Sequence, residues 1–134
     1  MIVVDFTNNA AKIIKAFAKY RAGTPFVPDN PDPQTCLHLY EAVLAQGVFN
    51  AEDAIAFAIL KASGTDAQVQ AFIHELRGRF VNQLATLEER KSFVYLLAKF
   101  VKSYLFLIHF FDFPAAVKQF ASFAEYVGPQ LIKQ

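Results

Sequence analysis

The chain has 134 residues, the size of one domain, and 54% of them are hydrophobic, so it can bury a core without disulfides or metals. Its net charge of +1 excludes a global field that would recruit nucleic acid or a membrane surface. The single cysteine, Cys36, permits no intramolecular disulfide and fits a reducing compartment, so we expect a cytoplasmic protein.

The N-terminal part of the sequence predicts a strand and a first helix. Residues 1–6 (MIVVDF) are apolar and β-branched, which predicts a strand stub that needs a sheet encoded elsewhere. Asn8 or Asn9 can then cap a helix over about Ala10–Tyr20, with Ile13, Ile14 and Phe17 on one side. Four prolines within residues 21–33 predict an extended crossover after that helix.

Capping signals predict where the later helices begin. Asp32 followed by Pro33 starts a helix to about Gln46. Asn50-Ala-Glu-Asp53 resembles a capping arrangement, with Phe49 placed to staple against the first turn, and capping boxes begin at Thr65 and Thr86. The remaining predicted helices are Ala51–Ser63, Asp66–Leu84, Leu87–Phe111 and Pro114–Val127, followed by a frayed tail at residues 130–134.

The central element is the apolar stretch Thr86–Phe113, predicted as one helix of about seven turns. Its longest uncharged apolar piece, Ser103–Phe111, is too short for a bilayer span of about twenty residues, so we expect no membrane partner. We expect every face of this helix to be buried except the strip of Lys91, Lys99 and Lys102. The fold class is therefore all-α: about six helices bundled around a long central helix, with an N-terminal strand stub.

No local motif predicts catalysis or a cofactor. His74-Glu75 begins like a zincin motif, but the required second histidine is replaced by Gly78. Glu89 and Lys91 superficially match a nuclease pattern, but that chemistry needs them on a strand, and here they open a helix. No phosphate-binding glycine loop is present. We therefore predict no catalytic, metal or cofactor-binding residue.

One weakly basic strip remains open to two interpretations. Lys91, Tyr95, Lys99 and Lys102 recur along one side of the central helix, and Arg77 and Arg79 lie on the helix before it. These five cations are candidate contacts for the DNA backbone. Alternatively, the strip is the solvated side that any mostly buried helix keeps.

Aliphatic and aromatic motifs follow one another in a definite order along the chain. They are Val3-Val4-Asp5-Phe6-x-Asn8, Ala16-Phe17, Asp32-Pro33 before Leu39-Tyr40, Gly47-Val48-Phe49 with Glu52-Asp53 and Phe57, Glu88-Glu89-Arg90-Lys91-x-Phe93, Phe100-x-x-x-Tyr104-x-Phe106-Leu107, and Phe111-x-Phe113. Over about residues 2–127 this order resembles the helical region of the R (restriction and motor) subunit of type I restriction–modification enzymes. The start of the last helix, Pro114–Lys118, departs from the acidic pattern of that family.

The resemblance implies a domain organisation and a function. Residues 1–6 would end a RecA-like motor domain that this chain lacks, and residues 7–129 would form the helical domain. The parent subunit is an ATP-dependent DNA translocase and endonuclease, so ATP and Mg²⁺ would be bound outside this region. The expected function is non-catalytic: docking on the motor domain and on the methyltransferase and specificity subunits, or engaging double-stranded DNA.

Two other functions remain open. The first is a stand-alone helical adaptor that binds a partner protein through exposed Phe and Leu side chains. The second is a small helical enzyme with a site built from His38, His74 and His109, which would require the three histidines to converge in the fold.

Overall fold

The computed structural model describes residues 32–131, and every regular element in this range is an α-helix. The all-α fold class is thus confirmed for these residues. The predicted strand at residues 1–6, the predicted helix at 10–20 and the crossover up to residue 31 lie outside the described residues. The helices are α2 (Pro33–Ala45), α3 (Ala51–Ser63), α4 (Asp66–Gln83), α5 (Leu87–Leu107) and α6 (Ala115–Leu131).

Side-chain caps fix the start of α2 to α5, as predicted. The Asp32 carboxylate accepts a 2.7 Å hydrogen bond from the Thr35 amide, which also lowers the pKa of Asp32. Reciprocal capping boxes open the next three helices at Asn50, Thr65 and Thr86. Each box satisfies two backbone N–H groups that the first turn of a helix leaves without partners.

The end of α5 was predicted wrongly, because the helix stops at Leu107 instead of Phe111. Pro114 disfavours helical geometry at the residue before it, so the chain must leave the helix by Phe113. Phe113 then turns back into the core, with its ring centroid 5.4 Å from that of Tyr104. This contact requires a sharp turn over residues 108–110, which shortens the helix to about six turns.

The end of α6 was also predicted wrongly, because the helix continues through Gly128 and Pro129 to Leu131. A proline inside a helix removes one backbone hydrogen bond and crowds the carbonyl four residues earlier. The packing of the last turns offsets this cost, since Val127, Gly128 and Leu131 are all buried. Residues 130 and 131 therefore belong to the helix and not to a frayed tail.

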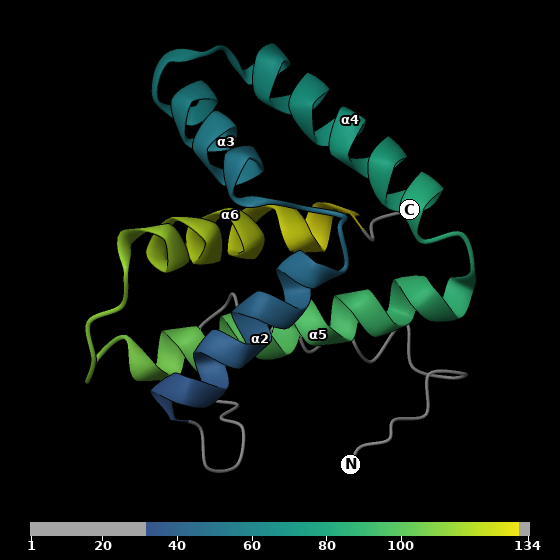
Figure 1. The fold of residues 1–134 in the computed structure, drawn as a ribbon. Helices are drawn as coiled ribbons and strands as arrows, with labels where there is room; N and C mark the ends of the chain where they lie inside the picture. The colour runs from purple at the N-terminus through teal and green to yellow at the C-terminus, as the bar shows by residue number, and fades with distance from the viewer. Residues whose placement is uncertain (1–31, 132–134) are drawn as a thin grey trace.

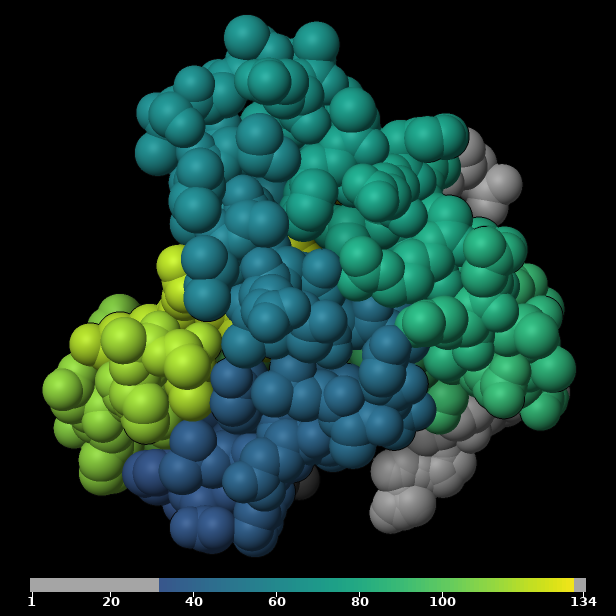
Figure 2. All heavy atoms as spheres, turned by 45° about the horizontal axis from the view of Figure 1, so that its top comes forward, coloured from purple at the N-terminus to yellow at the C-terminus, as the bar shows by residue number. Residues whose placement is uncertain are grey.

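Helix α6 lies between two parts of the fold (Figure 1). The α3–α4 hairpin packs on one side of it and α5 on the other, while α2 packs across α5. From the side on which α3 and α4 come forward, the helices close into a continuous surface with α6 visible mainly at one edge (Figure 2). None of the helices among residues 32–131 is long and apolar enough to cross a membrane.

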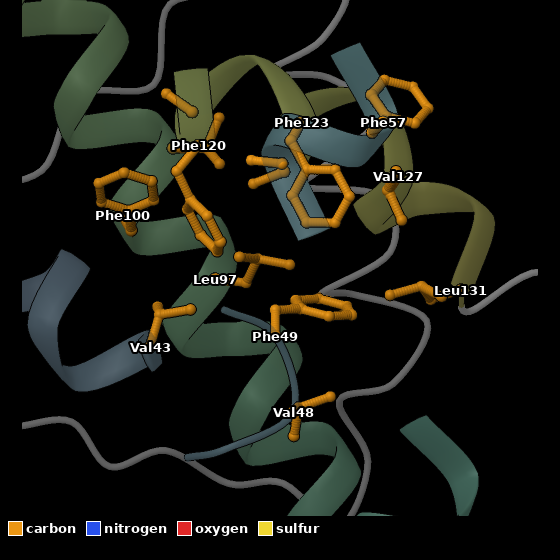
Figure 3. Close-up of a cluster of buried hydrophobic side chains, with 14 of the residues drawn as sticks. Val43, Val48, Phe49, Phe57, Leu97, Phe100, Phe120, Phe123, Val127 and Leu131 are labelled. Atoms are coloured by element: carbon orange, nitrogen blue, oxygen red, sulfur yellow. The ribbon is translucent and has the colours of Figure 1, made fainter. Parts of the chain in front are cut away.

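Phe49 occupies the centre of the core although it precedes α3 (Figure 3). Its ring packs edge-on against Phe93 of α5 at 5.4 Å and Phe123 of α6 at 5.5 Å. The sequence predicted that Phe49 would staple the first turn of α3, whereas its ring contacts join α5 to α6. Aromatic pairs of this geometry stabilise a core beyond the area that they bury.

Candidate functional site

The predicted DNA-contacting lysines lie on one side of α5, opposite the core residues Phe93, Leu97 and Phe100. Lys91, Lys99 and Lys102 are all half-buried. From Phe93 to Leu107 no residue of α5 is fully exposed, and several apolar residues beside the lysines are also only half-buried. We expected an exposed lysine strip on a helix that is otherwise buried. The lysines and their apolar neighbours are instead buried to a similar extent.

The electrostatics of this strip reflect its partial burial. The Lys99 ammonium lies 5.6 Å from the centroid of the Tyr95 ring, a cation–π distance. Burial, assisted by the nearby charge of Lys99, lowers the pKa of Lys102 to about 8. Arg77, Lys91 and Lys102 also each take part in an interaction, so none of them is a free cation. The DNA contact of this strip stays a prediction.

Arg79 makes an intramolecular ion pair instead of pointing freely outward. Its Nη1 atom lies 2.8 Å from Oδ2 and 2.9 Å from Oδ1 of Asp53, and donates to the Val48 carbonyl at 3.3 Å. Asp53 is buried and also accepts the Asn50 amide. The guanidinium of Arg79 thus joins α4 to the start of α3, which gives the residue a structural role that the sequence did not reveal.

The three histidines lie on separate elements. His38 on α2 is hydrogen-bonded to Gln34 at 2.8 Å, and His74 is exposed on α4. His109 follows α5, where its ring meets the edge of Phe110 at 6.4 Å. Within residues 32–131, no group of three or more His, Cys, Asp or Glu side chains is placed to hold a metal ion. The convergence required by the small-enzyme hypothesis is not found among these residues.

The residues of the two rejected motifs lie in helices, as predicted. Glu89 closes the capping box of α5 by accepting the Thr86 amide at 3.1 Å, and Lys91 follows it in the same helix. Gly78 lies in α4, four residues after His74. Neither arrangement places two ligands on one face.

Sequence reasoning missed an exposed aromatic tip made of Phe110 and Phe111, beside the half-buried Phe106. Phe110 is 68% exposed and Phe111 48% exposed, and the Phe106 ring lies 5.7 Å from that of Phe110. The tip exists because α5 stops early and the chain turns back before α6. An ion pair of 2.7 Å between Lys118 and Asp112 closes this turn beside the tip. Pro114 was only a partial signal, because it disfavours helical geometry at Phe113 but leaves a helix that ends at Phe111 allowed.

A second apolar surface lies on the hairpin. Ile55 and Ile59 are one turn apart on α3 and are 48% and 60% exposed. They form the outer side of a helix whose inner side, Ala54 and Phe57, faces the core. Both surfaces resemble protein-contact sites more than catalytic sites, because they are apolar and exposed.

No protein-family model matches the sequence, and neither a curated protein nor a solved structure matches it.

Proposed function

We propose that this chain is a non-catalytic helical docking module, similar to the helical region of a type I restriction enzyme R subunit. Its partners would be the motor domain of that subunit and the methyltransferase and specificity subunits, in the cytoplasm. ATP and Mg²⁺ would act in the motor and nuclease domains of the parent subunit. DNA contact by Lys91, Lys99 and Lys102 is a secondary part of the proposal.

The observation that supports the proposal best is the place of the resembling residues in the fold. Within residues 32–131, most of the hydrophobic residues quoted for the resemblance are buried, and Asp53 is buried in the ion pair with Arg79. They are Val48, Phe49, Phe57, Phe93, Phe100, Tyr104, Leu107 and Phe113. The resembling positions are therefore mainly those that form the core and stabilise the fold. Such a likeness favours a shared architectural module over a shared reaction.

The exposed aromatic tip supports a docking role. Large exposed aromatic side chains are typical anchors of protein interfaces, where a few central residues contribute most of the binding energy. Phe110 is the most exposed of the large hydrophobic side chains in the described range. We therefore assign the tip as the principal contact with a neighbouring domain or subunit.

The non-catalytic part of the proposal is tested by activity assays on the purified chain. With Mg²⁺, ATP and duplex DNA present, we expect neither ATP hydrolysis nor DNA cleavage. Magnesium-dependent cleavage that is lost in Glu89→Gln or Lys91→Ala would overturn the proposal. Both residues are in the first turns of α5, and Glu89→Gln keeps a side-chain oxygen for the cap.

The stand-alone adaptor is the second candidate, and the exposure of Phe110 also favours it. The two functions differ in the partner that is bound. The docking module should bind a methyltransferase–specificity complex encoded beside its own gene. An adaptor should show no affinity for that complex, and its gene should have no motor domain in frame.

A further inference from the structure

Helix α2 is attached to the bundle more simply than the other described helices. Among the helices of residues 32–131, α2 packs mainly on one neighbour, α5, whereas α3, α4, α5 and α6 each pack on at least two. The outward residues Thr35, His38, Glu41 and Ala45 of α2 are all exposed. It is therefore an edge helix, with water along one side and α5 along the other (Figure 1).

The contacts that hold α2 on the bundle are apolar. The Tyr40 ring centroid lies 5.7 Å from that of Phe100 on α5 and 5.6 Å from that of Phe120 on α6. Within the described part of the chain, no ion pair joins α2 to another helix. The α3–α4 hairpin, by contrast, is joined by the ion pair between Arg79 and Asp53. Separation of α2 from α5 therefore breaks no charged contact among these residues.

Two polar groups lie together inside this apolar interface. The Cys36 thiol of α2 and the Ser103 hydroxyl of α5 are both 0% exposed, and they are near enough to interact. Within residues 32–131, Ser103 Oγ has no hydrogen-bond partner. A buried hydroxyl without a hydrogen bond destabilises the state that buries it, so water that reaches Ser103 offsets part of the cost of separating the two helices.

Gly47 provides a hinge just after α2. Its φ of +75° lies in the left-handed region, and a Cβ at this position would meet nothing within 4 Å. Glycine adopts left- and right-handed backbone conformations about equally well, so the chain direction can change here at little cost. Directly after it, Val48 and Phe49 are buried in the core and Asn50 caps α3. A movement of α2 can therefore stop at Gly47 and leave α3 in place.

The Cys36 thiol is protected while α2 is closed, because burial excludes reagents and raises the pKa of Cys36 to about 11. Once α2 has moved away, the exposed thiol ionises more readily. Its thiolate can attack one sulfur of a low-molecular-weight disulfide to form a mixed disulfide, and the second sulfur leaves as a thiolate that takes up the proton. The added group has no room in an interface where Cys36 and Ser103 are both 0% exposed.

We propose that α2 opens at Gly47 as a unit while α3 to α6 stay folded, and that Cys36 is a thiol modification site reached only in this open form. A low-molecular-weight disulfide that oxidises Cys36 then holds α2 away from α5 and exposes the Phe100 ring that Tyr40 contacts. This inference does not depend on the proposed docking function, because it concerns only how α2 packs on α5.

Thiol labelling of the full chain over a series of urea concentrations tests the opening. The aromatic disulfide dithionitrobenzoate should modify Cys36 about tenfold or more faster than global unfolding allows, with a weak dependence on urea, because local opening exposes little surface. The control Cys36→Ala/Val127→Cys places the thiol at a 0% exposed position of α6, where it should react only through global unfolding.

Each labelling rate is compared with the unfolding equilibrium of the same variant, so a change in overall stability does not affect the comparison. If Cys36 reacts only as fast as global unfolding allows, with the same urea dependence as the control thiol, α2 does not open separately and the proposal is overturned.

Hydrogen exchange measured by mass spectrometry tests the effect of modification. In the chain whose Cys36 forms a mixed disulfide with cysteamine, the α2 amides should exchange about tenfold or more faster than in the reduced chain, because a detached helix of this length is marginal in water. The amides of α4 and α6 should be unchanged, and reduction should restore slow exchange in α2. Unchanged exchange in α2 would contradict the proposal, as would faster exchange throughout α3 to α6.

Discussion

Arg79 Nη1 lies 2.8 Å from Asp53 Oδ2, across 26 residues of sequence. The same carboxylate oxygen accepts the Asn50 amide, and the same guanidinium nitrogen donates to the Val48 carbonyl. One ion pair therefore joins the α2–α3 connection, the first turn of α3 and the C-terminal half of α4. Phe49, which lies inside this junction, is held where it packs against α5 and α6.

Loss of this ion pair should destabilise the whole bundle. Arg79→Ala leaves the buried Asp53 carboxylate without its cation, and Arg79 itself is about one-third exposed. We expect a loss of about 2 kcal/mol in the free energy of unfolding, below the full effect of breaking a buried pair. Urea unfolding measures it, with Gln70→Ala, an exposed change on the same helix, as the control expected within about 0.5 kcal/mol of wild type. If Arg79→Ala matched that control, the ion pair would not be important for the fold.

This junction marks a limit of what the sequence alone predicts. The caps at Asn50, Thr65 and Thr86 were predicted correctly because a cap depends on residues only three positions apart. The role of Arg79 was missed because its partner is distant in sequence, and a cation on a helix resembles a nucleic-acid contact until its neighbour is known. Helix ends were missed at α5 and α6 for a similar reason, since the packing of Phe113 and Leu131 decided them.

The stability of the chain should depend on the ionisation of Lys102. The pKa of Lys102 is near 10.5 when exposed and about 8 in the folded chain, so the unfolded chain binds more protons between these pH values. The charged form of Lys102 therefore destabilises the folded chain. This destabilisation is fully present below pH 8 and is relieved as the pH rises toward 10.5. Lys102→Met should therefore be more stable than wild type by about 1 kcal/mol at pH 7, after allowing for partial solvent screening.

The gain in stability of Lys102→Met over wild type should shrink toward zero by pH 10. The variant Lys102→Arg stays charged over this range, so it should remain less stable than Lys102→Met at every pH. Differences between variants are needed because burial raises the pKa of Cys36 to about 11 and so lowers the stability of every variant above pH 9. A Lys102→Met gain that is constant from pH 7 to 10 would show that Lys102 titrates normally in the folded chain.

Gly78 and Gly64 should respond in opposite directions to alanine. A Cβ at Gly78, inside α4, meets nothing within 4 Å, so Gly78→Ala should stabilise the chain by about 0.5–1 kcal/mol through helix propensity. A Cβ at Gly64 would lie 2.8 Å from the Leu60 carbonyl oxygen, so Gly64→Ala should destabilise it. Thermal unfolding of the two variants gives the signs. Destabilisation by Gly78→Ala would mean that the surface of α4 at this position is already occupied.

The buried hydroxyl of Ser103 should be dispensable for the fold. Ser103 Oγ makes no hydrogen bond of good geometry, although it lies near enough to the Cys36 thiol to lower its pKa slightly against the larger effect of burial. Because an unsatisfied buried hydroxyl costs free energy, Ser103→Ala should leave the free energy of unfolding unchanged or raise it by up to about 1 kcal/mol. Denaturant unfolding measures the change, and a loss above about 1 kcal/mol would reveal that the hydroxyl has a bonded partner in solution.

The most direct measurement of the docking function is a sedimentation titration. The purified chain is mixed with a methyltransferase–specificity complex encoded beside its gene, at concentrations up to tens of micromolar. We predict a complex with a Kd in the micromolar range or tighter, weakened about tenfold or more in Phe110→Ser/Phe111→Ser. Binding should be unchanged in the control Val81→Ser/Leu87→Ser, which alters two exposed hydrophobic residues outside both apolar surfaces. No association of the folded wild-type chain at these concentrations would contradict the account.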